Sequence, residues 1–349
     1  MTSVFVAHSP FQRFIAEHMV AAMPEFAGHR TMLVLDMPAS DPGGHTTARW
    51  ASVMVVEPPL GGSILGAGRR MRSVISQITS HLSSDERAAL FLSNVQWPLN
   101  NWLAREISRP PMARRVTWCN FPEGIGSLRI VHPDLRQRAR DPLKSLVAAV
   151  GGSRYYPVRG DLMGLERCTR IYSLLPDLLP AHLAGKVVAI PGFPIDSRAT
   201  AFDTCIFLGQ HDRFVPDRQR RLLADRAAQH CAGLGYTRRL FKSHHYGESA
   251  VQREAFAARG FEMMADARPI EQVMLERAVA CVVSFNSSAL VHLKMMFGPA
   301  IRCMSLFADE IGRYGRTRRA DSESVLAILE QSGVEMHKWN PSLSPSTHG

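Results

Sequence analysis

The sequence predicts an α/β protein made of two Rossmann-like domains. Short apolar runs of strand length alternate with amphipathic stretches of helical period, and this alternation implies parallel sheets with right-handed crossovers. The alternation is interrupted once, over residues 176–202, where prolines recur at short spacing. Because such a stretch is typical of a crossing between domains, we expect an N-terminal domain over 1–190 and a C-terminal domain over 191–340. The Pro/Ser-rich tail 341–349 is expected to be disordered.

The N-terminal half contains a series of candidate strands, each a short run rich in apolar residues. They are residues 3–7, 31–35, 52–56, 89–92 and 115–119, with a further apolar segment at 171–175. The polar turn His8-Ser9-Pro10 leads into an amphipathic helix whose apolar side chains recur at helical spacing as far as Ala22. A second helix is expected over 74–82, and the basic stretch 131–159 is expected to be partly helical.

The C-terminal half repeats this alternation. Strands are expected at 204–208, 237–242, 261–264, 280–284 and 300–304, and helices at 217–231, 270–278 and 322–331, with one more that begins within 284–290 and runs to about 297. Two α/β halves joined by a proline-rich crossing are the organisation of the GT-B architecture, whose active cleft lies between the domains. Sugar-nucleotide epimerases and periplasmic binding proteins would show the same periodicity, and the missing signal peptide counts against the latter.

The composition limits the classes of partner. The chain carries 41 Lys+Arg against 31 Asp+Glu, a formal net charge of +10, which favours nucleotides, acidic glycans or an anionic membrane surface; a solvated basic surface explains it equally well. The six cysteines form no C-x-x-C pair, which indicates neither a zinc site nor a disulfide framework and suits a reducing cytoplasm. No run approaches the roughly 20 apolar residues of a membrane-spanning helix. We therefore expect a cytoplasmic protein.

Three motifs follow predicted strands, where ligands bind in open α/β sheets. The first is 122–127, with the sequence P-E-G-I-G-S. Gly124 and Gly126 allow a ligand to approach the backbone closely, and Glu123 can accept a proton from a sugar hydroxyl. A tight turn with a solvated glutamate is the alternative. No third glycine follows at the spacing of the dinucleotide-binding fingerprint.

The second motif is 240–248, with the sequence L-F-K-S-H-H-Y-G-E. Imidazole has an unperturbed pKa near neutrality, so a histidine beside a lysine suits an anionic leaving group. We expect Lys242 to offset phosphate charge and either His244 or His245 to donate to a departing phosphate oxygen. Adjacent side chains of an extended segment point in opposite directions, so only one of the pair would enter the site. The spacing lacks the i, i+4 geometry of helical zinc ligands, and we expect no metal.

The third motif is 284–290, with the sequence S-F-N-S-S-A-L, where a strand passes into a helix. The hydroxyls of Ser284, Ser287 and Ser288 and the free N–H groups of a helix start would together form a phosphate cradle. An ordinary helix N-cap explains the segment equally well, because Ser and Asn are preferred capping residues.

Taken in order, these motifs resemble those of bacterial sialyltransferases and polysialyltransferases of capsule and lipooligosaccharide synthesis. Residues 122–124 resemble the D/E-D/E-G motif, 242–245 the K-x-H-P motif, and 287–288 the serine/threonine pair at a helix start. The opening 8–12, H-S-P-F-Q, is similar to the H-[ST]-P-x-Q turn near the start of many such proteins, and 266–271 is similar to their P-[IV]-E segment. The resemblance spans most of the chain through the order and spacing of short motifs.

The resemblance implies a GT-B, inverting, metal-independent transferase that uses CMP-sialic acid and no cofactor. It implies that Glu123 deprotonates the hydroxyl of an acidic glycan or glycolipid acceptor, and that His244 assists the departing CMP phosphate. The residues that it places on the donor side are Lys242, Gly209, Gln210, Ser284, Ser287 and Ser288. The residues that it places on the acceptor side are His8, Ser9, Gln12, Gly124 and Gly126.

Two positions depart from the family pattern. Pro122 stands where the first acid of D/E-D/E-G is found, and His245 stands where the proline of HP is found. These departures leave two other readings open. One is a transferase for another CMP-activated acidic sugar such as Kdo or for a different nucleotide sugar, and the other is a non-catalytic nucleotide- or glycan-binding protein of the same fold.

A group of arginines in the C-terminal half bears on further partners. They are Arg218, Arg220, Arg221, Arg238, Arg239, Arg313, Arg316, Arg318 and Arg319. They are not interleaved with aromatic residues, as surfaces that stack nucleic-acid bases require, so we expect no nucleic acid as a partner. They suit an anionic acceptor or the headgroups of an inner membrane that the protein would contact peripherally, and a simple solvated face is the alternative.

Overall fold

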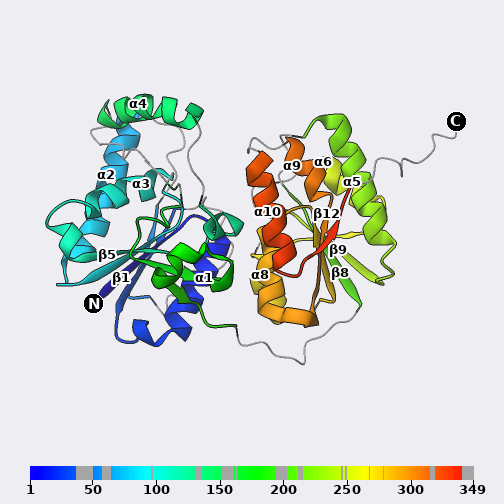
Figure 1. Cartoon of the computed structure of the whole chain (residues 1–349), viewed down its shortest axis with the longest axis horizontal. Helices are drawn as coiled ribbons and strands as arrows, with labels where there is room; N and C mark the ends of the chain where they lie inside the picture. Colours follow the sequence, from blue (N-terminus) through cyan, green and yellow to red (C-terminus); the bar gives the residue numbers. More distant parts are fainter. Residues whose placement is uncertain are drawn as a thin grey trace. The chain divides into compact units, whose positions relative to one another are not determined.

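The computed structural model divides the chain into two compact units, Met1–Phe193 and Pro194–Gly349 (Figure 1). The sequence pattern placed the expected boundary at 190/191. The structure describes residues 1–36, 50–56, 64–95, 97–130, 135–150, 161, 163–193, 203–210, 215–244, 247, 250–266, 268–277, 279–314 and 319–339. His245, the stretch 194–202 and the expected tail 341–349 lie outside these residues.

The N-terminal unit contains a seven-stranded parallel sheet with the order β3-β2-β1-β4-β5-β6-β7. Its strands are β1 (Thr2–Ala7), β2 (Arg30–Leu35), β3 (Ser52–Val55), β4 (Ala88–Leu92), β5 (Val116–Asn120), β6 (Arg170–Ser173) and β7 (Val187–Ala189). Val4 of β1 lies opposite Met32 of β2 and Leu90 of β4. The strand order reverses between β1 and β4, and such a switch point opens a crevice at the carboxyl ends of the strands.

Helices and short 3-10 turns connect these strands. They are α1 (Pro10–Ala22), η1 (Pro24–Phe26), α2 (Ile64–Ser83), α3 (Pro98–Ile107), η3 (Met112–Arg114), η4 (Ile125–Leu128), α4 (Leu135–Val150), η5 (Pro176–Leu178) and η6 (Ala181–Lys186). Every residue of β1 and β4 is buried, as expected for parallel strands covered on both faces. Aromatic rings fill the core, where Phe5 stacks on Phe91 with ring centroids 4.0 Å apart.

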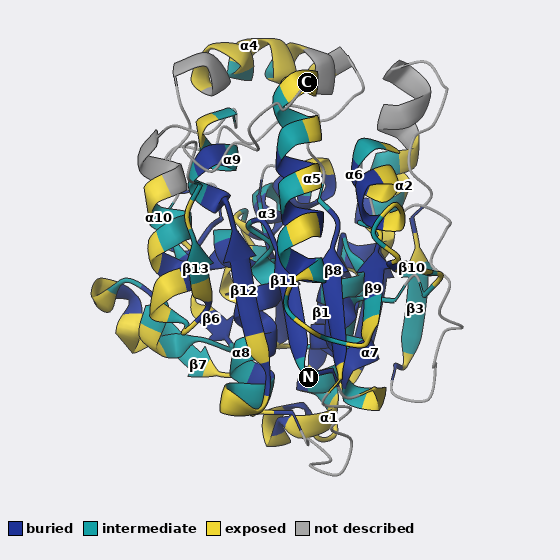
Figure 2. Cartoon of the chain, turned by 90° about the vertical axis from the view of Figure 1, so that its right-hand side faces the viewer, coloured by how far each residue is buried: buried dark blue, intermediate teal, exposed yellow. Residues whose placement is uncertain are grey.

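The C-terminal unit contains a six-stranded parallel sheet with the order β10-β9-β8-β11-β12-β13. Its strands are β8 (Thr204–Leu208), β9 (Arg238–Lys242), β10 (Glu262–Met264), β11 (Cys281–Ser284), β12 (Arg302–Leu306) and β13 (Glu335–His337). The order reverses between β8 and β11, which makes this pair the second switch point. Figure 2 shows the central strands of this sheet as buried, with the exposed residues on the helices around them.

The helices of the C-terminal unit alternate with its strands. They are α5 (Asp217–Ala232), α6 (Ala250–Ala257), α7 (Ile270–Glu276), α8 (Ser288–Phe297), η7 (Gly298–Ala300), α9 (Ala308–Tyr314) and α10 (Arg319–Gln331). The core again centres on phenylalanines: the ring of Phe207 lies 4.1 Å from that of Phe256 and 5.3 Å from that of Phe285, between centroids. Among the described residues, no helix is long and apolar enough to cross a membrane.

The structure confirms the two parallel α/β sheets and most of the expected elements. The strand 204–208 is observed residue for residue as β8, whereas the strand expected at 300–304 is observed two residues later because η7 occupies its start. The sequence pattern missed α3, α6 and α9, and it missed β7 and β13, which have three residues each. A three-residue strand is too short to show a period, and α6 and α9 have eight and seven residues.

Candidate functional site

The first candidate site lies in the N-terminal unit, at the carboxyl ends of four neighbouring strands. Asp36 directly follows β2, His8 follows β1, Trp97 stands between β4 and α3, and Glu123 lies in the loop after β5. Because β2, β1, β4 and β5 are adjacent and parallel, their carboxyl ends meet at one edge of the sheet, across the switch point. His8 and Glu123 are residues that the sequence motifs predict for the site, and the structure adds Asp36 and Trp97.

His8 is held from two sides. Its Nδ1 lies 3.0 Å from Oδ2 of Asp36, and its ring stacks on the indole of Trp97 with centroids 5.2 Å apart and planes 11° apart. The His8 side chain is 3% exposed. Its Nε2 is buried and has no hydrogen-bond partner among the described residues. With a carboxylate at Nδ1, the neutral ring carries its proton there and leaves Nε2 as an acceptor.

The other two residues of the H-S-P-x-Q turn hold the start of α1. Ser9 is the N-cap, and its hydroxyl accepts a hydrogen bond from the backbone N–H of Gln12 at 3.2 Å. The side-chain Oε1 of Gln12 accepts from the backbone N–H of His8 at 2.6 Å. This is a reciprocal arrangement close to a capping box, with Pro10 at the first helical position. The turn therefore fixes the backbone from which His8 projects.

The loop that carries Trp97 is fixed by α3. Asn100 donates to the carbonyl of Asn94 at 3.0 Å, and Asn101 donates to the carbonyl of Val95 at 3.2 Å. Both asparagines are fully buried. Trp97 itself is 37% exposed, an unusual exposure for the largest apolar side chain. It presents its ring to His8 and its N–H to Glu123.

Glu123 is positioned by the loop after β5. Its Oε1 accepts from the indole N–H of Trp97 at 3.1 Å, and its backbone N–H donates to the hydroxyl of Ser127 at 2.7 Å. Gly124 has φ +124° and ψ −157°, a conformation that is open essentially to glycine alone. Gly126 carries no such requirement, since a methyl group there would meet only the flexible side chain of Met163, with Cε at 3.4 Å and Sδ at 3.8 Å.

The surroundings of the Glu123 carboxyl group raise its pKa and leave one of its oxygens without a hydrogen-bond partner among the described residues. Burial raises the pKa of its carboxyl above the ordinary value of 4.5, and the Trp97 hydrogen bond, the nearby His8 and the backbone of Asn94 oppose this rise. Its Oε2 is buried and, within the described part of the chain, accepts no hydrogen bond of normal geometry. A carboxyl group whose pKa is raised by burial and whose second oxygen has no hydrogen-bond partner among the described residues is suited to act as a general base or acid.

The second candidate site lies in the C-terminal unit at the switch point between β8 and β11. Gly209 follows β8 and donates its backbone N–H to the carbonyl of Lys242 at 2.9 Å. A Cβ at this glycine would lie 2.8 Å from the ring of Phe241, so close packing requires glycine there. The next residue, Gln210, bridges the two strands, because its Oε1 accepts from the backbone N–H of Asn286 at 3.3 Å.

Gln252 of α6 completes this bridge. Its Oε1 accepts from the backbone N–H of Gln210 at 3.1 Å, and its Nε2 donates to the Gln210 carbonyl at 2.9 Å. Gln252 is 1% exposed. The side chain therefore acts as a fixed template for the loop after β8. No sequence motif indicated this residue, because its partner lies on a distant loop.

The three serines of the third motif have different environments. Ser284 is fully buried and donates its hydroxyl to the carbonyl of Leu208 at 2.9 Å, which ties β11 to β8. Ser287 is the N-cap of α8, and its hydroxyl accepts from the backbone N–H of Ala289 at 3.3 Å. Ser288 is the first residue of α8 and is half-buried. The N-cap is thus observed at Ser287, and α8 begins at the carboxyl end of a switch-point strand.

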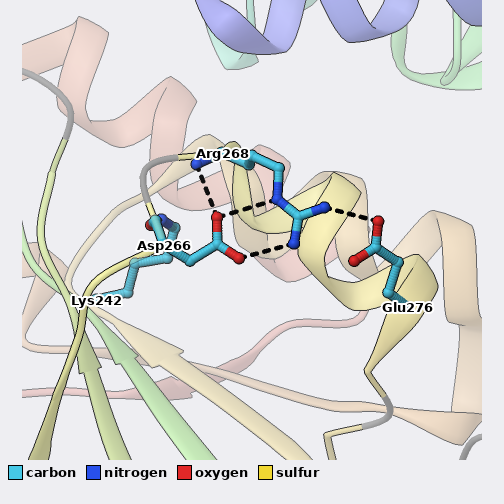
Figure 3. Close-up of polar contacts among 4 residues, drawn as sticks. All are labelled: Lys242, Asp266, Arg268 and Glu276. Atoms are coloured by element: carbon cyan, nitrogen blue, oxygen red, sulfur yellow. Dashed lines mark hydrogen bonds and ion pairs between the residues drawn. The ribbon is translucent and has the colours of Figure 1, made fainter. Parts of the chain in front are cut away.

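Lys242 at the end of β9 contacts the segment after β10 (Figure 3). Its ammonium group donates to the backbone carbonyl of Asp266, and burial lowers the pKa of the amine. Arg268 binds the carboxylate of Asp266 through Nε at 3.0 Å and Nη2 at 2.8 Å, and it binds Glu276 through Nη1 at 2.6 Å. The hydrogen bonds from Arg268 lower the pKa of Asp266 to about 2.

His244 lies two residues beyond β9 and is half-buried. Its carbonyl accepts from the backbone N–H of Gly247 at 2.8 Å, and Gly247 has φ +79°, as a tight turn requires. Glu271 of the 266–271 segment is the second residue of α7. Its Oε1 lies 2.9 Å from Nδ1 of His292 on α8, and both side chains are buried. This buried pair joins the two helices behind the loop of Lys242.

The structure thus brings the predicted residues together in two groups, one in each unit. In the N-terminal unit they are His8 and Glu123, which Trp97 joins, and Asp36 contacts His8. In the C-terminal unit the loops after β8, β9 and β11 carry Gly209, Gln210, Lys242, His244 and the serines. Within the described residues, no group of three or more His, Cys, Asp or Glu side chains is placed to hold a metal ion.

Comparisons with known proteins bear on the fold. No family model matches the sequence, and no curated protein matches it. The structure is similar to the GT-B domain of a sialyltransferase from Photobacterium damselae, with a TM-score of 0.53, 12% identity and coverage of 97% of this chain and 100% of that one.

Two further solved structures give comparable scores. A putative UDP-N-acetylglucosamine 2-epimerase from Listeria monocytogenes has a TM-score of 0.51 at 8% identity, covering 95% of this chain and 89% of that one. Arabidopsis thaliana UGT89C1 complexed with UDP-L-rhamnose has a TM-score of 0.50 at 9% identity, covering 96% of this chain and 84% of that one. Together with the two parallel sheets and their switch points, these similarities show that the chain has the GT-B fold over nearly its whole length.

Proposed function

We propose that this protein is an inverting glycosyltransferase that transfers sialic acid from CMP-sialic acid to a glycan acceptor of the bacterial surface. The GT-B fold supports this proposal, as do the order of the sequence motifs and their positions at the carboxyl ends of strands at or beside the two switch points. The observation that carries it is Glu123, a carboxyl group with a raised pKa and an unused buried oxygen beside an aromatic side chain. This is the group that an acceptor hydroxyl needs as its base.

In the proposed reaction, Oε2 of Glu123 takes the proton of the acceptor hydroxyl. The acceptor oxygen forms a bond to the anomeric carbon of the sugar on the face opposite the CMP phosphate, and the bond from that carbon to the phosphate oxygen breaks. The configuration at the anomeric carbon therefore inverts. CMP leaves as an anion, and His244 donates a hydrogen bond or a proton to its departing oxygen.

The C-terminal unit supplies the groups that bind the donor in this proposal. The N-terminus of α8, with Ser287 and Ser288, offers hydroxyl and backbone N–H groups to the phosphate. Lys242 adds positive charge near the end of β9, and its position is set by the carbonyl of Asp266. No cofactor is needed, because the CMP-sugar already carries its leaving group.

The pair of His8 and Asp36 belongs to the acceptor side in this proposal. Asp36 keeps the His8 proton on Nδ1, so Nε2 accepts a hydrogen bond from a second acceptor hydroxyl or from the reacting one. Asp36 is then a positioning residue that acts through His8. The exposed indole of Trp97 covers both His8 and Glu123.

Two measurements test the function. We expect CMP to raise the melting temperature of the protein more than UDP or GDP at equal concentration, because a ligand stabilises the folded state that binds it. Stabilisation by UDP or GDP alone would overturn the donor assignment. A screen of acceptors with CMP-sialic acid and with CMP-Kdo then identifies the sugar through the glycoside formed.

The role of His244 is tested by His244→Ala against His182→Ala, which removes an exposed histidine of η6. We expect His244→Ala to reduce acceptor-dependent CMP release about 100-fold or more, in the range of a lost general acid, and His182→Ala to leave it unchanged. Wild-type release by His244→Ala would remove this residue from the mechanism.

A further inference from the structure

Helix α4 carries its apolar side chains on the outside. Leu143 is 62% exposed and Leu146 is 61% exposed, the two highest values for large hydrophobic side chains in the described part of the chain. They lie three residues apart, so they occupy one face of the helix. By contrast, the half-buried positions of the same helix include Asp141 and Ser145. This is the reverse of the pattern of a helix that serves only its own core.

The exposed apolar face forms a continuous stripe. At about 100° per residue, Ala139, Pro142, Leu143, Leu146 and Ala149 fall within one arc of the helix, and all five are exposed. The helix packs on α2 of the same unit, and Figure 1 shows it next to α2 and away from the sheet. Figure 2 shows the exposed residues along its length. The stripe therefore faces away from the core of its unit.

Cations border this stripe on both sides. On the same helical projection, Arg140 and Lys144 lie along one margin and Arg138 lies along the other, and all three are exposed. Asp141 lies on the side of the helix opposite the leucines, and its Oδ1 is 3.7 Å from Nζ of Lys144. An apolar stripe between two basic margins matches the layered polarity of an anionic lipid surface, with acyl chains below and negative headgroups above.

We propose that α4 binds the surface of an anionic lipid bilayer and lies in the plane of the interface. Leu143 and Leu146 enter the boundary between headgroups and acyl chains, while Arg138, Arg140 and Lys144 contact the headgroup phosphates. A second copy of this chain fits the face less well. In a two-fold symmetric dimer the same patch meets itself, which brings the cations of both copies together.

The arginines of α5 do not provide an equal surface. The exposed Arg218 and Arg221 have no exposed leucine beside them on that helix. Charge alone gives weak, salt-sensitive attraction, whereas charge with inserted apolar side chains gives stable interfacial binding. This contrast makes the α5 arginines a suitable control.

Membrane binding by α4 is argued from its exposed leucines and cations and does not depend on the proposed function. It is compatible with a transferase that acts on lipid-linked acceptors. In the chain, α4 follows the loop of Glu123, so a membrane contact through α4 would favour acceptors that are anchored in the bilayer.

The test is flotation of the full chain with large unilamellar vesicles. One set contains phosphatidylglycerol and phosphatidylcholine, and the other contains phosphatidylcholine alone. We expect the wild type to float with the anionic vesicles and not with the neutral ones. We expect Leu143→Ser/Leu146→Ser to reduce partitioning onto anionic vesicles about tenfold or more, and Arg138→Glu/Arg140→Glu/Lys144→Glu to abolish it.

Two matched variants control for general loss of exposed apolar or basic residues. Met263→Ser removes an exposed apolar side chain of β10, and Arg218→Glu/Arg221→Glu removes charge from α5. Both should float as the wild type does. Melting temperature and release of CMP with a soluble acceptor should be unchanged in the leucine variant, which separates a failure of this inference from a failure of the proposed function.

Three outcomes would overturn the proposal. The first is a wild type that does not float with anionic vesicles at any salt concentration tested, and the second is a leucine variant that floats as well as the wild type. The third outcome is a stable dimer in light scattering that the leucine substitutions dissociate, with no vesicle binding, which would assign the stripe to a second copy of the chain.

Discussion

The carboxylate of Asp36 lies 3.0 Å from Nδ1 of His8, and the two residues directly follow neighbouring parallel strands. The contact leaves Nε2 of His8 as the ring nitrogen without a hydrogen-bond partner among the described residues. It also places a fixed negative charge behind a ring that stacks on Trp97. The relationship joins residues from two loops that are far apart in the sequence.

Asp36→Asn should lower acceptor-dependent CMP release about 10-fold to 100-fold, with little change in melting temperature. The amide no longer fixes the proton on Nδ1, so part of the population presents an N–H at Nε2 instead of an acceptor. The effect should fall on kcat and on KM for the acceptor, while KM for the donor stays the same. Asp36→Glu should recover part of the activity. Wild-type kinetics in Asp36→Asn would contradict the role of the pair.

Trp97→Phe should shift the pH dependence of kcat/KM. The variant keeps an aromatic ring against His8 but removes the N–H that donates to Glu123 at 3.1 Å. This hydrogen bond stabilises the ionised carboxylate and lowers its pKa, so its loss raises the pKa of Glu123 further. The acidic limb of the kcat/KM profile should therefore move to higher pH. Trp339→Phe in the C-terminal unit serves as the control, and an unmoved limb in Trp97→Phe would refute the link.

The two glycines of the 122–127 loop should respond differently to alanine. Gly124→Ala forces a side chain into φ +124° and should lower the free energy of unfolding by about 1–3 kcal/mol or displace Glu123. Gly126→Ala meets only ordinary contacts and should change it by less than about 0.5 kcal/mol. Urea unfolding of the two variants makes the comparison. Equal effects would show that the backbone of Gly124 is not constrained.

The sequence predicts those helices and strands whose formation is determined by the residues within them. Strand β8 was predicted residue for residue, because Thr204–Leu208 is a buried apolar run that ends at a glycine. Helix α3 was missed: its N-cap, Trp97, makes no side-chain capping bond, and its buried face includes Asn100 and Asn101. A pattern of apolar side chains cannot reveal a helix that buries amides.

The same distinction applies to the sites. Glu123 and His8 were predicted because each follows a predicted strand and lies in a recognisable motif. Asp36 and Trp97 were not, because their role comes from strand order, which brings the ends of β2 and β4 beside that of β1. Ser9 and Gln12 were expected on the acceptor side, and their observed contacts hold the start of α1. Whether the donor-side residues bind CMP stays a prediction.

Arg268→Ala should lower the stability of the protein at pH 4–7 and have little effect in strong acid. Arg268 lowers the pKa of Asp266 from 3.8 to about 2, so the stabilisation is fully present above pH 3.8 and is lost as the pH falls through about 2. The variant should therefore be less stable than the wild type at pH 4–7, and the difference should shrink as the pH approaches 2. Arg238→Ala, which removes an exposed pair with Glu262, should have a smaller effect at every pH. A difference that persists at pH 2 would contradict this account.

Glu123→Gln is the most direct test of the central claim, that the half-buried Glu123 carboxyl acts as the base of a glycosyltransferase. Burial raises the pKa of Glu123, so the wild type loses stability as the pH rises from 4.5 through the raised pKa, and the neutral amide avoids this loss. At pH 8 the variant should melt no lower than the wild type. Its rate of CMP release from CMP-sialic acid in the presence of acceptor should nevertheless be reduced about 100-fold or more. Glu17→Gln, which removes a surface carboxylate paired with Arg13, should keep full activity. Full activity in Glu123→Gln, or a loss that follows a lowered melting temperature, would contradict the claim.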